Sequence, residues 1–292
     1  MSLLPRDKGI ERASLLVRYS MPYLPRAALA CLATLLSACC LNVLMADIPP
    51  LPPQQALARL AVAHRGSIHD GKPDNSLGAF QQSISAGVTF LEVDVRLAPD
   101  GELFLFHDGS LQRSNYSEPG SLRGRKVQDL SASERASVLL DDSERIPSLS
   151  QALDGIRPYP GVSLQLDFKG ESDENVFPAL DLLRSRKQLH QAVLQIRSLE
   201  RVPRILSAAP DARLLVRVTS MEQLREAVTY PIEFVELERW ASPEAITVAH
   251  DARVKVLANL SATCLDTPSR WSYFRSRGID TIMTDYADKA IR

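Results

Sequence analysis

From Leu60 to the C-terminus, short apolar runs alternate with longer amphipathic stretches. Eight such runs in about 230 residues indicate parallel βα units and match the size of a (β/α)8 barrel. A doubly wound open sheet is the alternative, but no glycine-rich phosphate-binding turn follows the first run. The predicted strands are Leu60–His64, Phe90–Leu97, Ser163–Phe168, Ala192–Ile196, Arg213–Val218, Glu233–Leu237, Val254–Leu260 and Asp280–Thr284. The predicted helices are Ser76–Ala86, Ser148–Gly155, Asp173–Lys187, Leu199–Ala208, Met221–Thr229, Pro243–His250 and Pro268–Arg277.

One segment breaks the alternation, because Glu102–Phe106 follows the run Phe90–Leu97 without an intervening helix. The dipeptide Asp100-Gly101 between them predicts a β-hairpin, and a turn centred on it would place Asp94 opposite His107. The polar stretch from about 109 to 146 is too long for a plain loop. We therefore predict an α/β fold: a (β/α)8 TIM barrel over residues 60–292, with a small inserted subdomain after the second strand that covers the functional site.

The N-terminus has the layout of an export signal. Arg26 precedes an apolar stretch over residues 27–46, and Leu36-Ser37-Ala38-Cys39 is similar to the cleavage box of bacterial lipoproteins, in which the cysteine is lipidated. A retained transmembrane anchor is the alternative, since the run is near the lower length limit for a membrane span. The Pro-rich residues 47–59 predict an extended tether.

These features predict a signal or membrane-targeting segment over residues 1–46 and a barrel that is exported and attached to a membrane in the bacterial cell envelope or periplasm. The net charge of -1 gives no general attraction for nucleic acid, so no nucleic-acid partner is expected and an anionic substrate must be bound by a local site. Three of the four cysteines (31, 39 and 40) lie in the N-terminal segment, which argues against a disulfide framework.

Paired carboxylates on one predicted strand indicate a metal site. Glu92 and Asp94 are two residues apart, so they face the same side of the strand, where burial is costly unless a cation neutralises them. Asp167, in another apolar run, is a candidate third ligand. Oxygen ligands alone favour Mg²⁺ or Ca²⁺ over zinc. Lys169 shares the face of Asp167 and could bind phosphate, or the two could form a structural ion pair.

Two histidines end or follow apolar runs near these carboxylates. His64 and His107 can act as acid and base near neutral pH, although a core or capping role would be the simpler interpretation of either one alone. Arg65 offers paired donors to a phosphate. Asn75 precedes a predicted helix and could be an ordinary N-cap or reach the site as a supporting residue. Together these residues indicate a metal-assisted phosphodiesterase rather than a binding module.

The ordered motifs resemble those of the glycerophosphodiester phosphodiesterase family over residues 61 to 287. The family's HRG and ENT motifs correspond to His64-Arg65-Gly66 and Asp74-Asn75-Ser76, its E-x-D pair to Glu92-Val93-Asp94, its HD motif to His107-Asp108, and its E-x-K motif to Asp167-Phe168-Lys169. Ile146-Pro147-Ser148-Leu149 and Gly278–Asp285 match two further motifs. The resemblance implies a barrel with an insertion, one divalent cation held by Glu92, Asp94 and Asp167, and two catalytic histidines.

The chain departs from the family pattern in three places. Asp74 and Asp167 stand where the family has glutamate, and the family's late W-T-V-N strand reads Leu257-Ala258-Asn259-Leu260, without the tryptophan. The last change concerns the leaving-group pocket and therefore the substrate.

The sequence predicts metal-dependent hydrolysis of a glycerophosphodiester to sn-glycerol 3-phosphate and an alcohol. His64 and His107 would supply acid and base catalysis, and Arg65 and Lys169 would bind the phosphate. One alternative is a phospholipase D-like enzyme acting on a lysophospholipid or a phosphosphingolipid, which membrane attachment would suit. The other alternative is a non-catalytic, membrane-tethered binding lipoprotein.

Overall fold

The computed structural model describes residues 60–112, 116–117, 119–140, 144–170, 175–237 and 241–292. The predicted signal segment (1–46), with Cys39, and the Pro-rich tether (47–59) lie outside the described residues and stay predictions. Within the described ranges, no helix has both the length and the apolar character that a membrane crossing requires.

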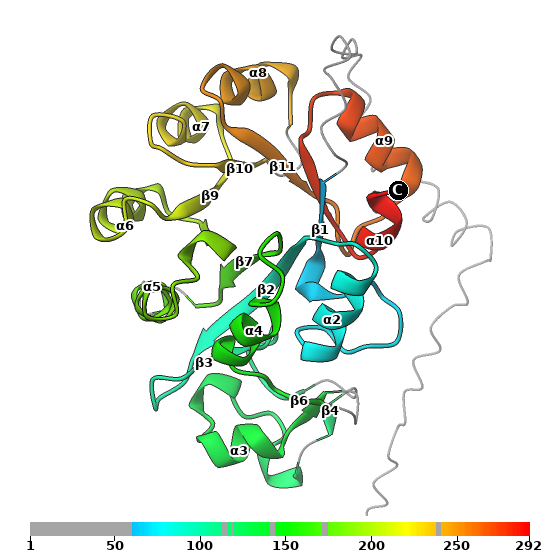
Figure 1. Cartoon of the computed structure of the whole chain (residues 1–292), viewed down its shortest axis with the longest axis vertical. Helices are drawn as coiled ribbons and strands as arrows, with labels where there is room; N and C mark the ends of the chain where they lie inside the picture. The colour runs from blue at the N-terminus through cyan, green and yellow to red at the C-terminus, as the bar shows by residue number, and fades with distance from the viewer. Residues whose placement is uncertain (1–59, 113–115, 118, 141–143, 171–174, 238–240) are drawn as a thin grey trace, which may run out of the picture. The chain divides into compact units, whose positions relative to one another are not determined.

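Eight parallel strands close into the barrel that the sequence predicts (Figure 1). Neighbouring strands follow the order β1-β12-β11-β10-β9-β8-β7-β2, and β1 also pairs with β2, which joins the two ends of the sheet. Short apolar runs suit strands that are covered on both faces, as parallel strands are. Every predicted strand end lies within one residue of the observed end. The strands are β1 Leu60–Ala63, β2 Phe90–Leu97, β7 Ser163–Phe168, β8 Ala192–Ile196, β9 Arg213–Val218, β10 Phe234–Leu237, β11 Lys255–Asn259 and β12 Thr281–Thr284.

The predicted helices are all present and surround the barrel (Figure 1). Serine hydroxyls begin several of them: Ser76, Ser148, Ser220 and Ser242 each accept a hydrogen bond from a backbone N–H in the first turn. The predicted Leu199–Ala208 helix consists of a 3-10 turn, Leu199–Arg201, followed by α6. The helices are α2 Leu77–Ser85, α4 Leu149–Ile156, α5 Val176–Ser185, α6 Val202–Ala208, α7 Met221–Ala227, α8 Pro243–Asp251, α9 Pro268–Ser276 and α10 Ala287–Ala290.

Side-chain alternation divides the barrel interior into an apolar layer and a polar layer. Because successive residues of a strand face opposite sides, a residue two positions after an inward-facing one also faces inward. The apolar layer is a buried cluster of Val62, Phe90, Val193, Leu215, Phe234, Leu257 and Met283. Two residues further along the same strands come His64, Glu92, Gln195, Arg217, Glu236, Asn259 and Asp285. The carboxyl ends of the strands therefore meet in a polar mouth, where TIM-barrel enzymes have their active sites.

The hairpin after β2 is present, but its register differs by one residue from the prediction. Strand β3, Leu103–Leu105, pairs antiparallel with β2, with Val95 opposite Leu105. Asp94 is therefore next to Phe106, whose N–H donates to the Asp94 carbonyl at 3.0 Å, and not opposite His107. The cause is a three-residue loop ending at Gly101, whose φ of 83° extends the turn by one residue beyond the predicted two-residue form.

A small antiparallel sheet lies in the chain between β3 and α4. It consists of β4 Tyr116–Ser117, β5 Leu139–Leu140 and β6 Glu144–Arg145, accompanied by α3 Ala132–Ser137. A separate buried cluster stabilises it, formed by residues such as Leu111, Val127 and Leu130 together with Phe104 of β3. In Figure 1 these elements lie beside the barrel, beyond β3. That the insertion covers the site stays a prediction.

Candidate active site

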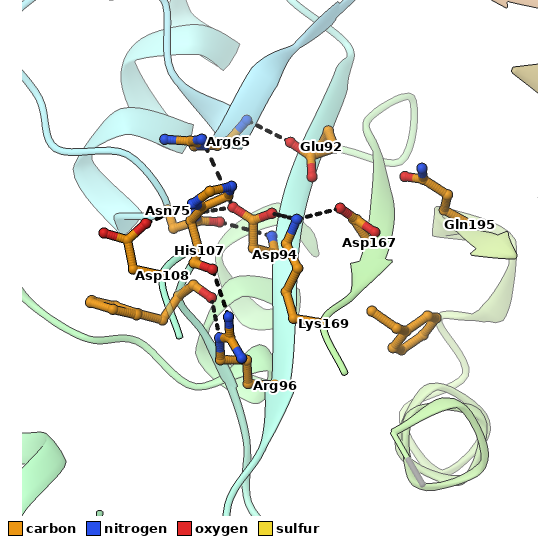
Figure 2. Close-up of polar contacts among 12 residues, drawn as sticks. Arg65, Asn75, Glu92, Asp94, Arg96, His107, Asp108, Asp167, Lys169 and Gln195 are labelled. Atoms are coloured by element: carbon orange, nitrogen blue, oxygen red, sulfur yellow. Dashed lines mark hydrogen bonds and ion pairs between the residues drawn. The ribbon is translucent and has the colours of Figure 1, made fainter. Parts of the chain in front are cut away.

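Three carboxylates converge at the mouth of the barrel, on the neighbouring strands β2 and β7 (Figure 2). The parallel register sets Asp94 beside Asp167, and Glu92 faces inward two residues before Asp94. All three side chains are buried, and each offers one oxygen that lies within 4.8 Å of the others. A set of oxygen donors at this spacing fits a hard divalent cation such as Mg²⁺ or Ca²⁺. The structure thus brings together the three residues predicted as metal ligands.

Lys169 links two of these carboxylates, with its Nζ 2.7 Å from Asp94 Oδ1 and 2.6 Å from Asp167 Oδ2. The sequence left open whether Lys169 forms an ion pair or binds phosphate, and the structure contains the ion pair. Burial acts to lower the pKa of Lys169, but the charges of Asp94, Asp167 and Glu92 outweigh burial and raise it. Lys169 is therefore a permanent cation at the mouth.

Glu92 carries the most perturbed carboxyl group of the cluster. Burial and the charges of Asp94 and Asp167 raise its pKa well above the ordinary value, while Lys169 and a hydrogen bond from the Arg65 backbone N–H (2.8 Å) oppose the rise. Without a cation, this carboxyl therefore tends to keep its proton. A divalent cation would remove that preference, because it would supply the positive charge that Lys169 cannot give to three carboxylates at once.

Arg65 follows β1 in a 3-10 turn, His64–Gly66, and has a left-handed backbone with φ of 53°. Its Nη1 donates to Asp74 Oδ2 at 3.0 Å, and its Nε lies 3.8 Å from Asp94 Oδ2. The pKa of Arg65 is raised, since Asp94 and Asp74 outweigh the opposing effect of burial. The guanidinium is thus held beside the carboxylate cluster, where a bound phosphate could use its remaining donors.

Gly66 makes this turn possible for two reasons. Its φ of 67° lies in the region that L-residues avoid, and a Cβ added there would come 2.1 Å from the ring of Phe80 on α2. Its carbonyl accepts a hydrogen bond from the Ser83 hydroxyl at 2.8 Å. Helix α2 therefore packs directly against the backbone that carries His64 and Arg65.

Asn75 supports the cluster and is more than a helix cap. Its Nδ2 donates to Asp94 Oδ2 at 2.7 Å, and its Oδ1 accepts from the Asp94 backbone N–H at 3.0 Å. Its own N–H donates to the Arg65 carbonyl at 2.8 Å. The N-cap of α2 is instead the next residue, Ser76. The predicted supporting contact is present, and Asn75 fixes both the orientation of Asp94 and the turn at Arg65.

Each of the two predicted histidines has a carboxylate partner on Nδ1. His64 Nδ1 lies 2.7 Å from Asp285 Oδ1, and His107 Nδ1 lies 2.8 Å from Asp108 Oδ1. An ionised carboxylate only accepts hydrogen bonds, so Nδ1 of each ring carries the proton and Nε2 is left for chemistry. Asp285 is itself fixed by the Ala262 N–H at 2.9 Å, and hydrogen bonds from His64 and Ala262 lower its pKa despite burial.

The pKa of His107 is lowered, mainly by burial and also by the charges of Arg65 and Lys169, against the opposing effects of Asp108 and Asp94. The backbone near His107 is held from β2, because Arg96 donates to the carbonyl oxygens of Phe106 (2.9 Å) and His107 (2.7 Å). The one-residue change in hairpin register therefore does not remove His107 from the site, where its charge still acts on Asp94.

The sequence interpretation missed several polar residues of the mouth. Arg197 follows β8, and its Nη2 lies 2.6 and 2.8 Å from the two oxygens of Asp167. Gln195 accepts from Gln165 and donates to Glu236, both at 2.9 Å, which forms a hydrogen-bonded row across the barrel. Counting in steps of two from the inward apolar residue of each strand would have found these positions.

Comparisons with known proteins identify the family of the chain. The family model of the glycerophosphoryl diester phosphodiesterase family matches residues 64–289. The chain belongs to this family. The family assignment identifies the chain as a phosphodiesterase, as the motifs predicted.

Among its relatives is a Mycobacterium tuberculosis protein named probable glycerophosphodiester phosphodiesterase 2, which is 27% identical over 79% of this chain and 88% of its own length. A glycerophosphoryl diester phosphodiesterase structure from Parabacteroides distasonis has a TM-score of 0.65 at 24% identity, over 81% of this chain and 87% of that chain. A phosphodiesterase from Oleispira antarctica, solved with the product sn-glycerol-3-phosphate, has a TM-score of 0.64 at 18% identity, covering 79% and 94% of the two chains. At these identities the solved structures support the barrel fold.

Proposed function

We propose that this protein hydrolyses glycerophosphodiesters to sn-glycerol 3-phosphate and an alcohol, with a divalent cation and two histidines. The observation that carries the proposal is the arrangement of the mouth. Two imidazoles, each oriented by a carboxylate on Nδ1, belong to the same site as three clustered carboxylates. An inactive binding protein would gain nothing from orienting two histidines in this way.

Glu92, Asp94 and Asp167 would hold the cation, Mg²⁺ or Ca²⁺. When bound, it would offset the charge that develops on a phosphoryl oxygen in the transition state. Arg65 and Lys169 would bind the remaining phosphoryl oxygens, because both are permanent cations whose side chains are fixed at the edge of the cluster. Asn75 would act through Asp94, whose carboxylate it orients.

The histidines would move the proton. One takes a proton from the attacking oxygen, which is that of water or of the glycerol 2-hydroxyl. As the new P–O bond forms, the bond between phosphorus and the alcohol oxygen breaks, and the other histidine donates a proton to that oxygen. If the 2-hydroxyl attacks, a cyclic phosphate forms first, and water opens it with the histidines in exchanged roles. Asp285 and Asp108 would stabilise the imidazolium formed at each stage.

Attachment to a membrane outside the cytoplasm is part of the proposal, and the sequence supports it through the apolar stretch 27–46 and the lipidation box at Cys39. Incorporation of radiolabelled palmitate into the full chain, but not into a Cys39→Ala variant, would support the lipoprotein form. Equal labelling of both would argue against it.

Release of sn-glycerol 3-phosphate from glycerophosphoethanolamine and glycerophosphocholine tests the reaction, with Mg²⁺, Ca²⁺ or EDTA. We expect cation-dependent release that EDTA abolishes, and His64→Ala or His107→Ala should reduce kcat by about 100-fold or more. Unchanged release in EDTA would contradict the metal role. No release from a folded, cation-loaded protein, together with turnover of a lysophospholipid, would move the substrate class to lipids.

A further inference from the structure

Two arginines project into the mouth on the side opposite His64. Strand β9 is four steps from β1 in either direction around the closed sheet, so Arg217 on β9 lies across the mouth from the end of β1. Arg197 follows the neighbouring strand β8, and the register pairs Ile196 with Val216, the residues just before the two arginines. Arg197 and Arg217 are therefore neighbours on adjacent strands and face the same way.

Like charges at neighbouring positions of a sheet are destabilising unless other groups compensate them. Here each arginine has a carboxylate on the adjacent strand that lies on the side away from the other arginine. Arg197 is bound to Asp167 through Nη2, and the Arg217 Nε lies 4.0 Å from Glu236 Oε1. The guanidinium of each arginine carries five N–H donors. Their side chains remain 41% and 34% exposed, so both can be reached from the mouth.

Glu236 lies beside Arg217 in the barrel wall. It is buried, and it accepts from Gln195 Nε2 at 2.9 Å. Burial raises the pKa of Glu236, and the charges of both Arg217 and Arg197 act against that rise, as does a hydrogen bond with Asn259. Arg197 also binds Asp167 of the carboxylate cluster, whereas the proposed chemistry assigns no step to Arg217 or Glu236.

Resting on the proposed function, we propose that Arg197 and Arg217 bind an anionic group carried by the alcohol part of the substrate. The diester phosphate is already assigned to Arg65 and Lys169, and glycerol is neutral, so only the alcohol can bring a second anion to this wall. Paired guanidiniums suit a carboxylate or a phosphate. A quaternary ammonium is instead recognised by aromatic faces, whereas two guanidiniums would repel a cation. The substrate class is thus glycerophosphodiesters of acidic alcohols.

Two matched substrate pairs test this assignment. Glycerophosphoserine and glycerophosphoethanolamine differ by one carboxylate, and glycerophosphoglycerol with or without a terminal phosphate differs by one phosphate. We expect kcat/KM to be higher for the acidic member of at least one pair by about tenfold or more. Ratios near one for both pairs would overturn the inference while leaving the proposed function intact. No release of sn-glycerol 3-phosphate from any of the four would refute the proposed function as well.

An Arg217→Gln variant identifies the residue responsible, and Arg213→Gln is its matched control. Arg213 lies at the start of the same strand and donates to Glu233 and Ser163, far from the mouth. The preference for the acidic substrate should fall about tenfold in Arg217→Gln and stay unchanged in Arg213→Gln. An unchanged ratio in a folded Arg217→Gln would overturn the assignment. If that variant does not fold, Arg217→Lys, which keeps the charge but loses the paired donors, should show a smaller loss, and an undiminished ratio there would equally overturn it.

Discussion

Replacing Asp285 by asparagine should slow turnover without preventing folding. Both oxygens of Asp285 accept hydrogen bonds, one from His64 Nδ1 at 2.7 Å and the other from the Ala262 N–H at 2.9 Å. An asparagine has one acceptor oxygen, so either His64 or the backbone N–H must face its NH2 group. If the histidine loses its acceptor, the imidazolium also loses a charged partner. A hydrogen bond to a charged group contributes about 1.5–3 kcal/mol, which corresponds to a decrease in kcat of roughly 10- to 150-fold.

The assay is release of sn-glycerol 3-phosphate at saturating substrate and cation, with KM measured alongside. We expect KM to change little, because His64 is proposed to act on the proton rather than to hold the phosphate. Asp280→Asn is the matched control: Asp280 also binds a histidine, His250, at 2.9 Å, but it lies at the opposite end of β12. A kcat within twofold of wild type for Asp285→Asn would refute the proposed role of the His64–Asp285 pair. An equal loss in Asp280→Asn would show that general destabilisation is the cause.

Three further predictions concern stability. Gly66→Ala should lower the free energy of unfolding by about 2–4 kcal/mol in urea titrations, from the left-handed φ and the overlap with Phe80, and Phe80→Leu should restore part of the loss. The hydrogen bond with Asp280 raises the pKa of His250, so the stability that this charged pair contributes should be full below about pH 6.5 and lost as pH rises through the raised pKa. The difference in thermal unfolding between wild type and Asp280→Asn should therefore narrow at high pH without vanishing, because Asp280 also accepts the Val256 N–H at 2.7 Å. A difference that does not change with pH would contradict this. Mg²⁺ or Ca²⁺ at about 100 times its Kd should raise the free energy of unfolding of the EDTA-treated protein by about 2.7 kcal/mol. This rise should be absent in Asp167→Asn. An equal rise in that variant would exclude Asp167 as a ligand.

The sequence predicted the barrel well because its signal is local and repeated. Each strand is a short apolar run, such as Ala192–Ile196, and several helices begin with a capping serine. An error in predicting one element therefore does not change the prediction of the next. The hairpin register was wrong because Asp100-Gly101 suits both a two-residue turn and the end of a three-residue loop. The strand register and the hydrogen bond from the Gly101 N–H to the Ala98 carbonyl, 3.0 Å, identify the three-residue form.

The candidate ligands were predictable, whereas most of their partners were not. Glu92 and Asp94 are two residues apart, so their shared face follows from the strand alone. The partner of His64 is Asp285, 221 residues away, and the contact arises only because β12 pairs with β1. The pairing of Arg197 with Asp167 likewise depends on strand neighbours and side-chain reach. Closure of the barrel brings such residues onto neighbouring strands, but which side chains then meet depends on strand register and side-chain reach, which a single sequence does not specify.

The charge layout explains how the barrel can enclose three buried carboxylates before any cation binds. The register sets Asp94 beside Asp167, which like charges would disfavour, but Lys169 binds an oxygen of each and Arg197 binds Asp167 from the other side. Burial and the charges of Asp94 and Asp167 raise the pKa of Glu92, so the charge on this third carboxyl is the least favourable of the cluster. The chain's own cations thus compensate Asp94 and Asp167, and Glu92 is the carboxylate whose charge a bound divalent cation would stabilise most.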